Sequence, residues 1–178
     1  KYLDFFKVGS GDLTAYPILK KISQFKKPII LSTGLSSFKE IKKTVNFIKK
    51  IPFYKNKNNL SLLQCTSDYP TNDNEVNIYA MSQLKKFSNI IGYSHHNKGD
   101  LALITAYCLG AQILEFHFTD DRSNKTFRDH KISLTKNETK NLIKKIKRIK
   151  KFIKKDFTKP TFREISSGNV KSFRRAVY

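Results

Sequence analysis

The chain has 178 residues, 39% of them hydrophobic, which is enough for one domain with a sizeable core. Its 35 Lys and Arg residues against 14 Asp and Glu give a formal net charge of +21, which favours anionic partners such as nucleic acid, acidic membrane surfaces or phosphorylated metabolites. No apolar run approaches the roughly 20 residues that span a membrane. Cys65 and Cys108 lie in apolar surroundings without metal-ligand spacing, and we interpret them as reduced core thiols of a cytoplasmic protein.

Five short, continuously apolar runs predict strands at Asp4–Ser10, Ile29–Thr33, Leu60–Thr66, Ile90–Tyr93 and Ile113–Asp121. Helical spacing predicts helices from Asp12 or Thr14 to about Phe25, at Phe38–Lys50, from about Asn74 to Lys86, at Leu101–Leu109 and from Thr135 to about Lys154. Continuous apolar strands indicate burial on both faces, and therefore a parallel sheet. The succession predicts an α/β fold, a partial (β/α)8 TIM barrel, because a complete barrel needs roughly 250 residues. A doubly wound open sheet is the alternative.

The lysines lie mostly on the outer faces of these predicted helices. The last helix carries the run KKIKRIKKFIKK, with Leu142, Ile143, Ile146, Ile149 and Ile153 as its expected inner stripe. Such a run suits an RNA or membrane contact, but on the outside of a barrel it is a solvated face, which we favour. The chain is also rich in Ile and Asn, so a compositional drift explains the charge at least as well as a binding surface.

Polar residues gather where the predicted strands end, which is where parallel α/β sheets bind ligands. His96 and His117 each follow a strand, and two converging imidazoles predict a metal site. Glu115 shares a strand face with His117. A phosphate would suit the cation and hydroxyls at the other ends, Lys7, Ser10, Ser67 and Ser94. Taken singly, each histidine is better explained as a structural residue and each hydroxyl as a loop cap, and only their convergence favours a site.

Six motifs in order carry a family resemblance: KVGSGD, PIILSTG, LLQCTSDYPT, IIGYSHHNKG, GAQILEFHFTDD and RDHKISL. Together they closely resemble the sialic acid (N-acetylneuraminate) synthase family, from about Tyr2 to the end of the chain. That family is a (β/α)8 barrel and a transferase. It condenses phosphoenolpyruvate with an N-acetylated, N-acetylmannosamine-like amino sugar to give a sialic or related nonulosonic acid and phosphate.

The resemblance implies a role for each candidate residue. A divalent cation, manganese or magnesium, would be bound by His96 and His117. Phosphoenolpyruvate would be bound by Lys7, Ser10, Ser67 and Ser94. The sugar would be faced by Asp12, Tyr69 and Asp129. Catalytic groups would be Asp12, Glu115 and Asp129.

The chain departs from the family pattern at several of these motifs. His95 replaces an aspartate, Phe116 a lysine, and Phe127-Arg128 a Gly-Pro pair, while Asp12 stands where glutamate is common. These changes indicate a different sugar acceptor more than a different reaction.

The resemblance also implies a domain organisation. Residues 1–156 would be about strands four to eight of the barrel, and residues 157–178 a linker towards a C-terminal antifreeze-like domain. A homodimer is expected of the full-length protein, and the 178-residue chain alone is expected to be inactive. Two alternatives remain: a basic nucleic-acid-binding α/β module, and an inactive truncated scaffold.

Overall fold

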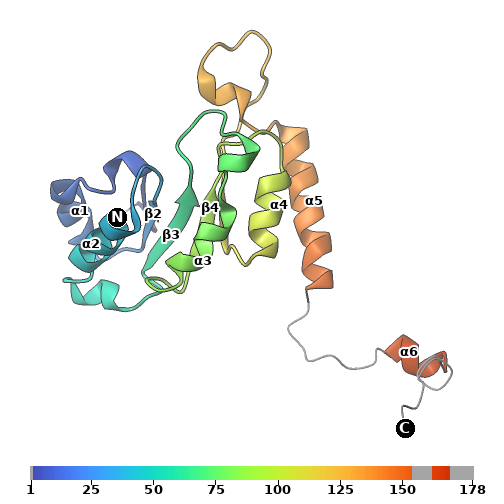
Figure 1. Ribbon diagram of the computed structural model, residues 1–178, viewed down its shortest axis with the longest axis horizontal. Coiled ribbons are helices and arrows are strands. Elements are labelled where there is room, and N and C mark those ends of the chain that lie inside the picture. The colour runs from blue at the N-terminus through green and yellow to red at the C-terminus, as the bar shows by residue number, and fades with distance from the viewer. Residues whose placement is uncertain (1, 154–161, 169–178) are drawn as a thin grey trace.

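The computed structural model describes residues 2–153 and 162–168, and its centre is one parallel sheet (Figure 1). The strands are β1 (Phe6–Val8), β2 (Ile29–Ser32), β3 (Leu60–Cys65), β4 (Ile91–Ser94) and β5 (Ile113–Glu115). Each strand pairs in parallel with the next one along the chain, in the order β1-β2-β3-β4-β5. A doubly wound sheet would reverse this order at a switch point. The predicted succession of βα units is therefore confirmed, and the doubly wound alternative is wrong.

The sheet is curled into a half-barrel, as one ion pair between its two edge strands demonstrates. In a flat sheet, β1 and β5 would lie about 19 Å apart, because neighbouring strands are spaced by about 4.8 Å. Yet Lys7 Nζ on β1 lies 3.3 Å from Glu115 Oε1 on β5. Both side chains therefore point into the concave face, which is the interior of the half-barrel.

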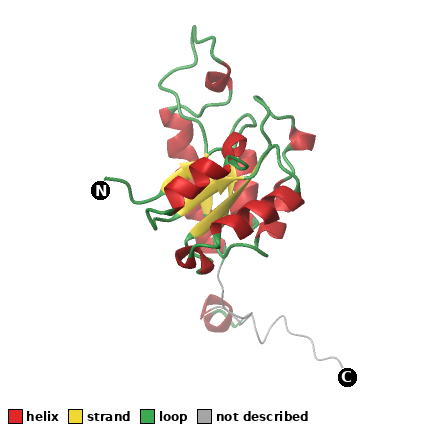
Figure 2. Cartoon of the chain, turned by 90° about the vertical axis from the view of Figure 1, so that its left-hand side faces the viewer, coloured by secondary structure: helices red, strands yellow, loops and turns green. Residues whose placement is uncertain are grey.

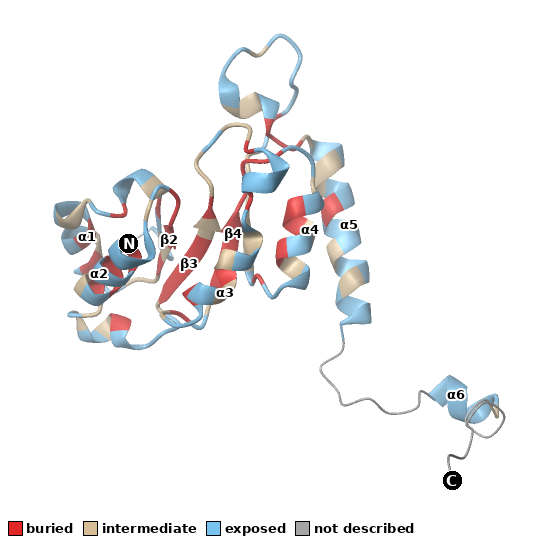
Figure 3. Cartoon of the chain, viewed as in Figure 1, coloured by how far each residue is buried: buried red, intermediate tan, exposed pale blue. Residues whose placement is uncertain are grey.

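The helices cover the convex face of this sheet (Figure 2). They are α1 (Tyr16–Ser23), α2 (Phe38–Ile48), α3 (Met81–Leu84), α4 (Leu101–Cys108) and α5 (Lys136–Phe152). Alternate strand residues point outward beneath them and form the core, among them Leu31, Leu62 and Tyr93, each at most 2% exposed. Figure 3 shows the buried residues concentrated on β3, β4 and the helix surfaces that face the sheet.

Two helices begin where the sequence places a capping box. Ser37 accepts a hydrogen bond from the backbone of Glu40 at the start of α2, and the Glu40 side chain accepts one from the backbone of Ser37. Thr135 and Glu138 repeat the arrangement at α5. Each box satisfies two backbone N–H groups that the first helical turn leaves unpaired. The expected core positions of α2, Ile41, Val45 and Ile48, are buried as predicted.

Three expectations are wrong. The helix predicted from Asn74 to Lys86 is two 3₁₀ turns and the four-residue α3, because Asn77 adopts a left-handed conformation (φ 46°) that ends helical continuity. The inner stripe of α5 is only partly buried: Leu142 is enclosed, but Ile143 and Ile153 are about half exposed. Cys108 is exposed at the end of α4 and is not a core thiol, whereas Cys65 is buried.

Most of the predicted linker, residues 157–178, lies outside the described residues. Its described part contains one short helix, α6 (Phe162–Ser166). In the part of the chain that the structure describes, no helix has the length and apolar character needed to cross a membrane.

Candidate active site

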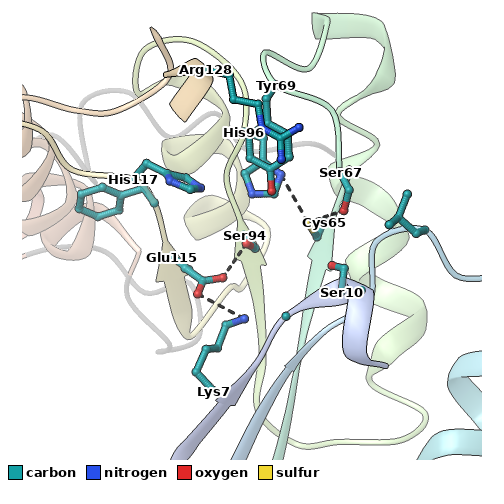
Figure 4. A pocket seen from close by; sticks show the side chains of 14 residues that line it. Lys7, Ser10, Cys65, Ser67, Tyr69, Ser94, His96, Glu115, His117 and Arg128 are labelled. Atoms are coloured by element: carbon teal, nitrogen blue, oxygen red, sulfur yellow. Dashed lines mark hydrogen bonds and ion pairs between the residues drawn. The ribbon is translucent and has the colours of Figure 1, made fainter. Parts of the chain in front are cut away.

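A pocket of about 560 Å³ opens on the concave side, at the carboxyl ends of the strands (Figure 4). It joins eight of the ten residues singled out from the sequence, which is why we treat it as the candidate site. Those eight are Lys7, Ser10, Ser67, Tyr69, Ser94, His96, Glu115 and His117.

The floor of the pocket is a hydrogen-bonded network around Lys7 and Glu115. Besides its ion pair with Glu115, the Lys7 ammonium donates to Ser32 Oγ at 2.9 Å. Ser94 Oγ donates to the second carboxylate oxygen of Glu115 at 2.6 Å. The network spans β1, β2, β4 and β5, and it fixes the position of one cation and one carboxylate.

Beside this network, Gly34 lies between two serine hydroxyls. Its backbone N–H donates to Ser10 Oγ at 3.0 Å. A Cβ at this position would lie 2.4 Å from Ser67 Oγ and 2.9 Å from Ser10 Oγ. Any larger residue would displace both hydroxyls, so the glycine allows two short donors to face the pocket from different loops.

The two histidines lie side by side on the opposite wall. Their ring centroids are 5.4 Å apart. His96 Nδ1 donates to the Thr66 carbonyl at 2.7 Å, and His117 Nδ1 lies 3.6 Å from Asp129 Oδ2. In both rings an oxygen acceptor therefore faces Nδ1, which is how proteins orient metal-binding imidazoles through their second nitrogen. Nε2 remains in each ring as the possible ligand atom.

This donor set fits a divalent cation only as an open site. Within the described residues, no three His, Cys, Asp or Glu side chains are gathered into a complete protein ligand set. Two imidazoles are typical ligands of divalent transition metals, and manganese would fit here if oxygen atoms of substrate or water, the ligands it prefers, fill the remaining positions.

An aromatic stack covers these rings. Tyr69 lies over His96 with a centroid separation of 4.1 Å, and its ring is edge-on to His117 at 5.8 Å. The guanidinium carbon of Arg128 lies 4.6 Å from the Tyr69 centroid, on the outer side of the stack. Figure 4 shows Arg128 and Tyr69 together at the end of the pocket away from Lys7.

The ionisable groups respond to burial and to one another. Burial lowers the pKa of His117, although Asp129 partly opposes this effect, and a neutral imidazole is the form that binds metal. Burial would raise the pKa of the Cys65 thiol, but the hydrogen bond and charge of His96 outweigh it and lower that pKa. Burial would lower the pKa of His96, but the hydrogen bond and charge of Cys65 and the hydrogen bond to the Thr66 carbonyl outweigh it and raise that pKa. Burial also lowers the pKa of His95 to about 4.

Two predicted residues do not line the pocket. Asp12 is exposed on a 3₁₀ turn after β1. Asp129 lies behind His117, and its Oδ1 is buried without a hydrogen-bond partner within the described residues. The fourth histidine, His130, pairs with Thr119 Oγ1 instead.

Three pocket or network residues with polar or ionisable side chains were not among the predicted site residues. Cys65 was interpreted as core, yet its place at the end of β3, two residues before Ser67, could have identified it. Ser32 ends β2 in the same way. Arg128 had only its departure from the family pattern as a signal.

The comparisons with known proteins agree with this geometry. The NeuB family matches residues 1–157. The chain belongs to the NeuB family. Among curated relatives, N,N'-diacetyllegionaminic acid synthase of Campylobacter jejuni is 43% identical over 84% of this chain and 44% of its own length. Human N-acetylneuraminate-9-phosphate synthase is 36% identical over 83% of this chain and 40% of its own. The chain thus spans less than half the length of these NeuB relatives.

Solved structures support the half-barrel. The N-acetylneuraminic acid synthetase of Leptospira borgpetersenii, solved with citrate, has a TM-score of 0.84 and 31% identity. The match covers 98% of this chain and 60% of that protein. A truncated 3-deoxy-D-arabino-heptulosonate 7-phosphate synthase of Thermotoga maritima, 21% identical with a TM-score of 0.67, shares the fold.

Proposed function

We propose that this chain carries the reaction centre of an enzyme that condenses phosphoenolpyruvate with an N-acetylated amino sugar, giving a nonulosonic acid and phosphate. The observation that carries the proposal is the convergence of Lys7, the serine hydroxyls and two histidines in one pocket of a NeuB-family half-barrel. The synthase names of the relatives support the reaction class. The acceptor sugar is narrowed below.

Phosphoenolpyruvate fits the floor of the pocket, because it carries a phosphate and a carboxylate. Lys7 supplies a fixed positive charge, while Ser10 and Ser67 supply short donors on either side of Gly34. A charge-assisted hydrogen bond to an anion is roughly twice as strong as a neutral one. Glu115 holds Lys7 in place and also accepts from Ser94, so the cation is positioned at the floor before a substrate binds.

The acceptor fits the wall formed by His96, His117 and Tyr69. A divalent cation on the two imidazoles would supply Lewis-acid polarisation of the sugar carbonyl. Tyr69 lines the pocket beside the two imidazoles, and Asp129 keeps His117 oriented. The enol carbon then attacks the carbonyl carbon. Water adds to the resulting cation, whose charge the Glu115 carboxylate stabilises, and phosphate leaves when its C–O bond breaks.

Binding by the 178-residue chain tests this proposal directly. Calorimetric titration with phosphoenolpyruvate should show one site, weakened about tenfold or more in Ser67→Ala and Ser10→Ala. Ser123→Ala, on an exposed loop, is the control and should bind like the original chain. Manganese binding should be lost in His96→Ala and His117→Ala. Phosphoenolpyruvate binding that survives loss of both serines would contradict the proposed site.

A turnover assay tests the catalytic part of the proposal. We expect sugar-dependent phosphate release only when the chain is joined to upstream strands that complete the barrel, since a half-barrel leaves the acceptor open to water. The same strands would cover the edges of β1 and β5. We also propose a cytoplasmic location and, for the full-length protein, a homodimer.

The rival proposal, a basic nucleic-acid-binding module, has less support. It needs aromatic rings interleaved with lysines on one exposed face. The lysine-rich helix α5 instead contains one aromatic residue, Phe152.

A further inference from the structure

Two cationic side chains, Lys7 and Arg128, line the pocket. They differ in whether their N–H groups already have acceptors, and this difference indicates which chemical group the acceptor sugar carries. Lys7, on the floor, is committed: it pairs with Glu115 and donates to Ser32 Oγ and the Val8 carbonyl. Arg128, at the end of the pocket away from Lys7 (Figure 4), forms an ion pair only with the adjacent Asp129 among the described residues, at 3.6 Å from Nε. That separation is too long for a hydrogen bond.

The terminal nitrogens of Arg128 are available. No hydrogen bond within the described part of the chain occupies them, and the side chain is 66% exposed. One face of the guanidinium nevertheless has a partner, because it lies over the Tyr69 ring at 4.6 Å and Tyr69 in turn packs on His96. A planar cation held on an aromatic face, with its fork of N–H groups open, is suited to bidentate binding of a carboxylate or phosphate.

The location separates this cation from the phosphoenolpyruvate groups. Those groups are assigned to the floor, around Lys7, Ser10 and Ser67. Arg128 lies at the end of the pocket away from Lys7 (Figure 4), which the proposed function assigns to the part of the acceptor beyond its reacting carbonyl. Resting on the proposed function, we propose that Arg128 forms an anion subsite for the acceptor, so that the preferred amino sugar carries a phosphate monoester or a carboxylate.

The inference depends on the guanidinium rather than on the overall charge of the chain. A net charge of +21 attracts any anion weakly, so the test needs a control that loses the same charge elsewhere. Arg148 provides it: its guanidinium lies over the Phe152 ring at 5.9 Å on α5, a similar cation–aromatic contact outside the pocket. Arg128→Gln and Arg148→Gln are therefore matched in chemistry and differ in place.

The experiment titrates the manganese-loaded chain with three acceptors: N-acetylmannosamine, its 6-phosphate, and N-acetylmannosaminuronic acid. We expect at least one anionic sugar to bind about tenfold or more tightly than the neutral one. The phosphate and uronate arms show which anion it is. Arg128→Gln should abolish the preference, Arg128→Lys should keep only part of it, and Arg148→Gln should leave it unchanged.

Several results would overturn the inference: equal affinity for all three sugars, no sugar binding beside intact phosphoenolpyruvate binding, or a preference that survives in Arg128→Gln. Loss of phosphoenolpyruvate affinity in Arg128→Gln would also overturn it, since Arg128 would then belong to the floor. A chain that fails to bind phosphoenolpyruvate at all refutes the proposed function itself, which keeps the two failures distinct.

Discussion

The two faces of the curled sheet differ in what they contribute. The convex face places Leu31, Leu62 and Tyr93 beneath the helices, where the burial of their side chains stabilises the fold. The concave face places Lys7, Ser32, Ser94 and Glu115 around one another and towards the pocket. Because successive residues alternate between faces, the same strands supply the core and the site. Substitutions on the convex face should therefore change stability, and those on the concave face should change binding.

The largest expected effect is on the convex face. Leu62→Ala removes a completely buried side chain from the central strand β3 and should lower the free energy of unfolding by about 3 kcal/mol. Urea denaturation followed by circular dichroism measures this change. Ile143→Ala, at a position about half exposed on α5, is the control and should cost less than about 1 kcal/mol. Equal losses would mean that β3 is not the centre of the core.

Gly92→Ala should be an exception to this division between the two faces, because it changes a residue of the concave face and should still lower stability. A Cβ at Gly92 would lie 2.3 Å from the Ile113 carbonyl oxygen and 2.6 Å from Leu63 Cδ2. Overpacking of this kind costs about 1–3 kcal/mol. Gly9→Ala is the matched control, since its Cβ would meet nothing within 4 Å. A thermal melt of both variants tests the expectation, and an unchanged Gly92→Ala melt would contradict the close strand packing.

Lys7→Met should separate binding from stability. The Lys7–Glu115 pair is about one-third exposed, so its net contribution to stability is below about 1 kcal/mol. Loss of the cation should nevertheless weaken phosphoenolpyruvate binding about tenfold or more, measured by calorimetry. Lys140→Met, on the exposed face of α5, should leave that affinity unchanged. A large loss of stability without a loss of affinity would assign Lys7 to the fold instead of the site.

The smallest effects are expected on the outer lysines. Lys144→Gln combined with Lys147→Gln should change stability by less than about 0.5 kcal/mol, because both side chains are exposed on α5. Binding to phosphoenolpyruvate should not change. Salt-resistant retention of the original chain on a nucleic-acid column, lost in this double variant, would instead favour the nucleic-acid-binding alternative.

The inner strands were predicted closely because their signal is local: Ile29–Thr33 and Leu60–Thr66 each differ from the observed strand by one residue. The two edge strands are shorter than predicted, since Asp4–Ser10 contains only Phe6–Val8 and Ile113–Asp121 only Ile113–Glu115. The helix expected from Asn74 to Lys86 failed because the left-handed Asn77 interrupts it. A residue in a left-handed conformation leaves no mark on hydrophobic spacing.

The sequence predicted which residues line the site better than it predicted the contacts between them. Eight predicted residues line the pocket, since parallel strands deliver their carboxyl ends to one edge. The Cys65–His96 contact at 3.6 Å and the position of Arg128 over Tyr69 were not predicted. Both join loops whose paths no periodicity describes.

The sequence by itself determined which side chains share a strand face, the order of the βα units and the resemblance to a synthase family. Only the tertiary structure decided that Lys7 and Glu115 meet across the half-barrel, that the His96 and His117 rings lie 5.4 Å apart, and that Asp12 stays outside the pocket. The physical reason is that alternation along a strand is fixed by the local backbone. Distances between residues far apart in sequence depend instead on how strongly the sheet curls and where each loop returns, and these are set by packing over the whole domain.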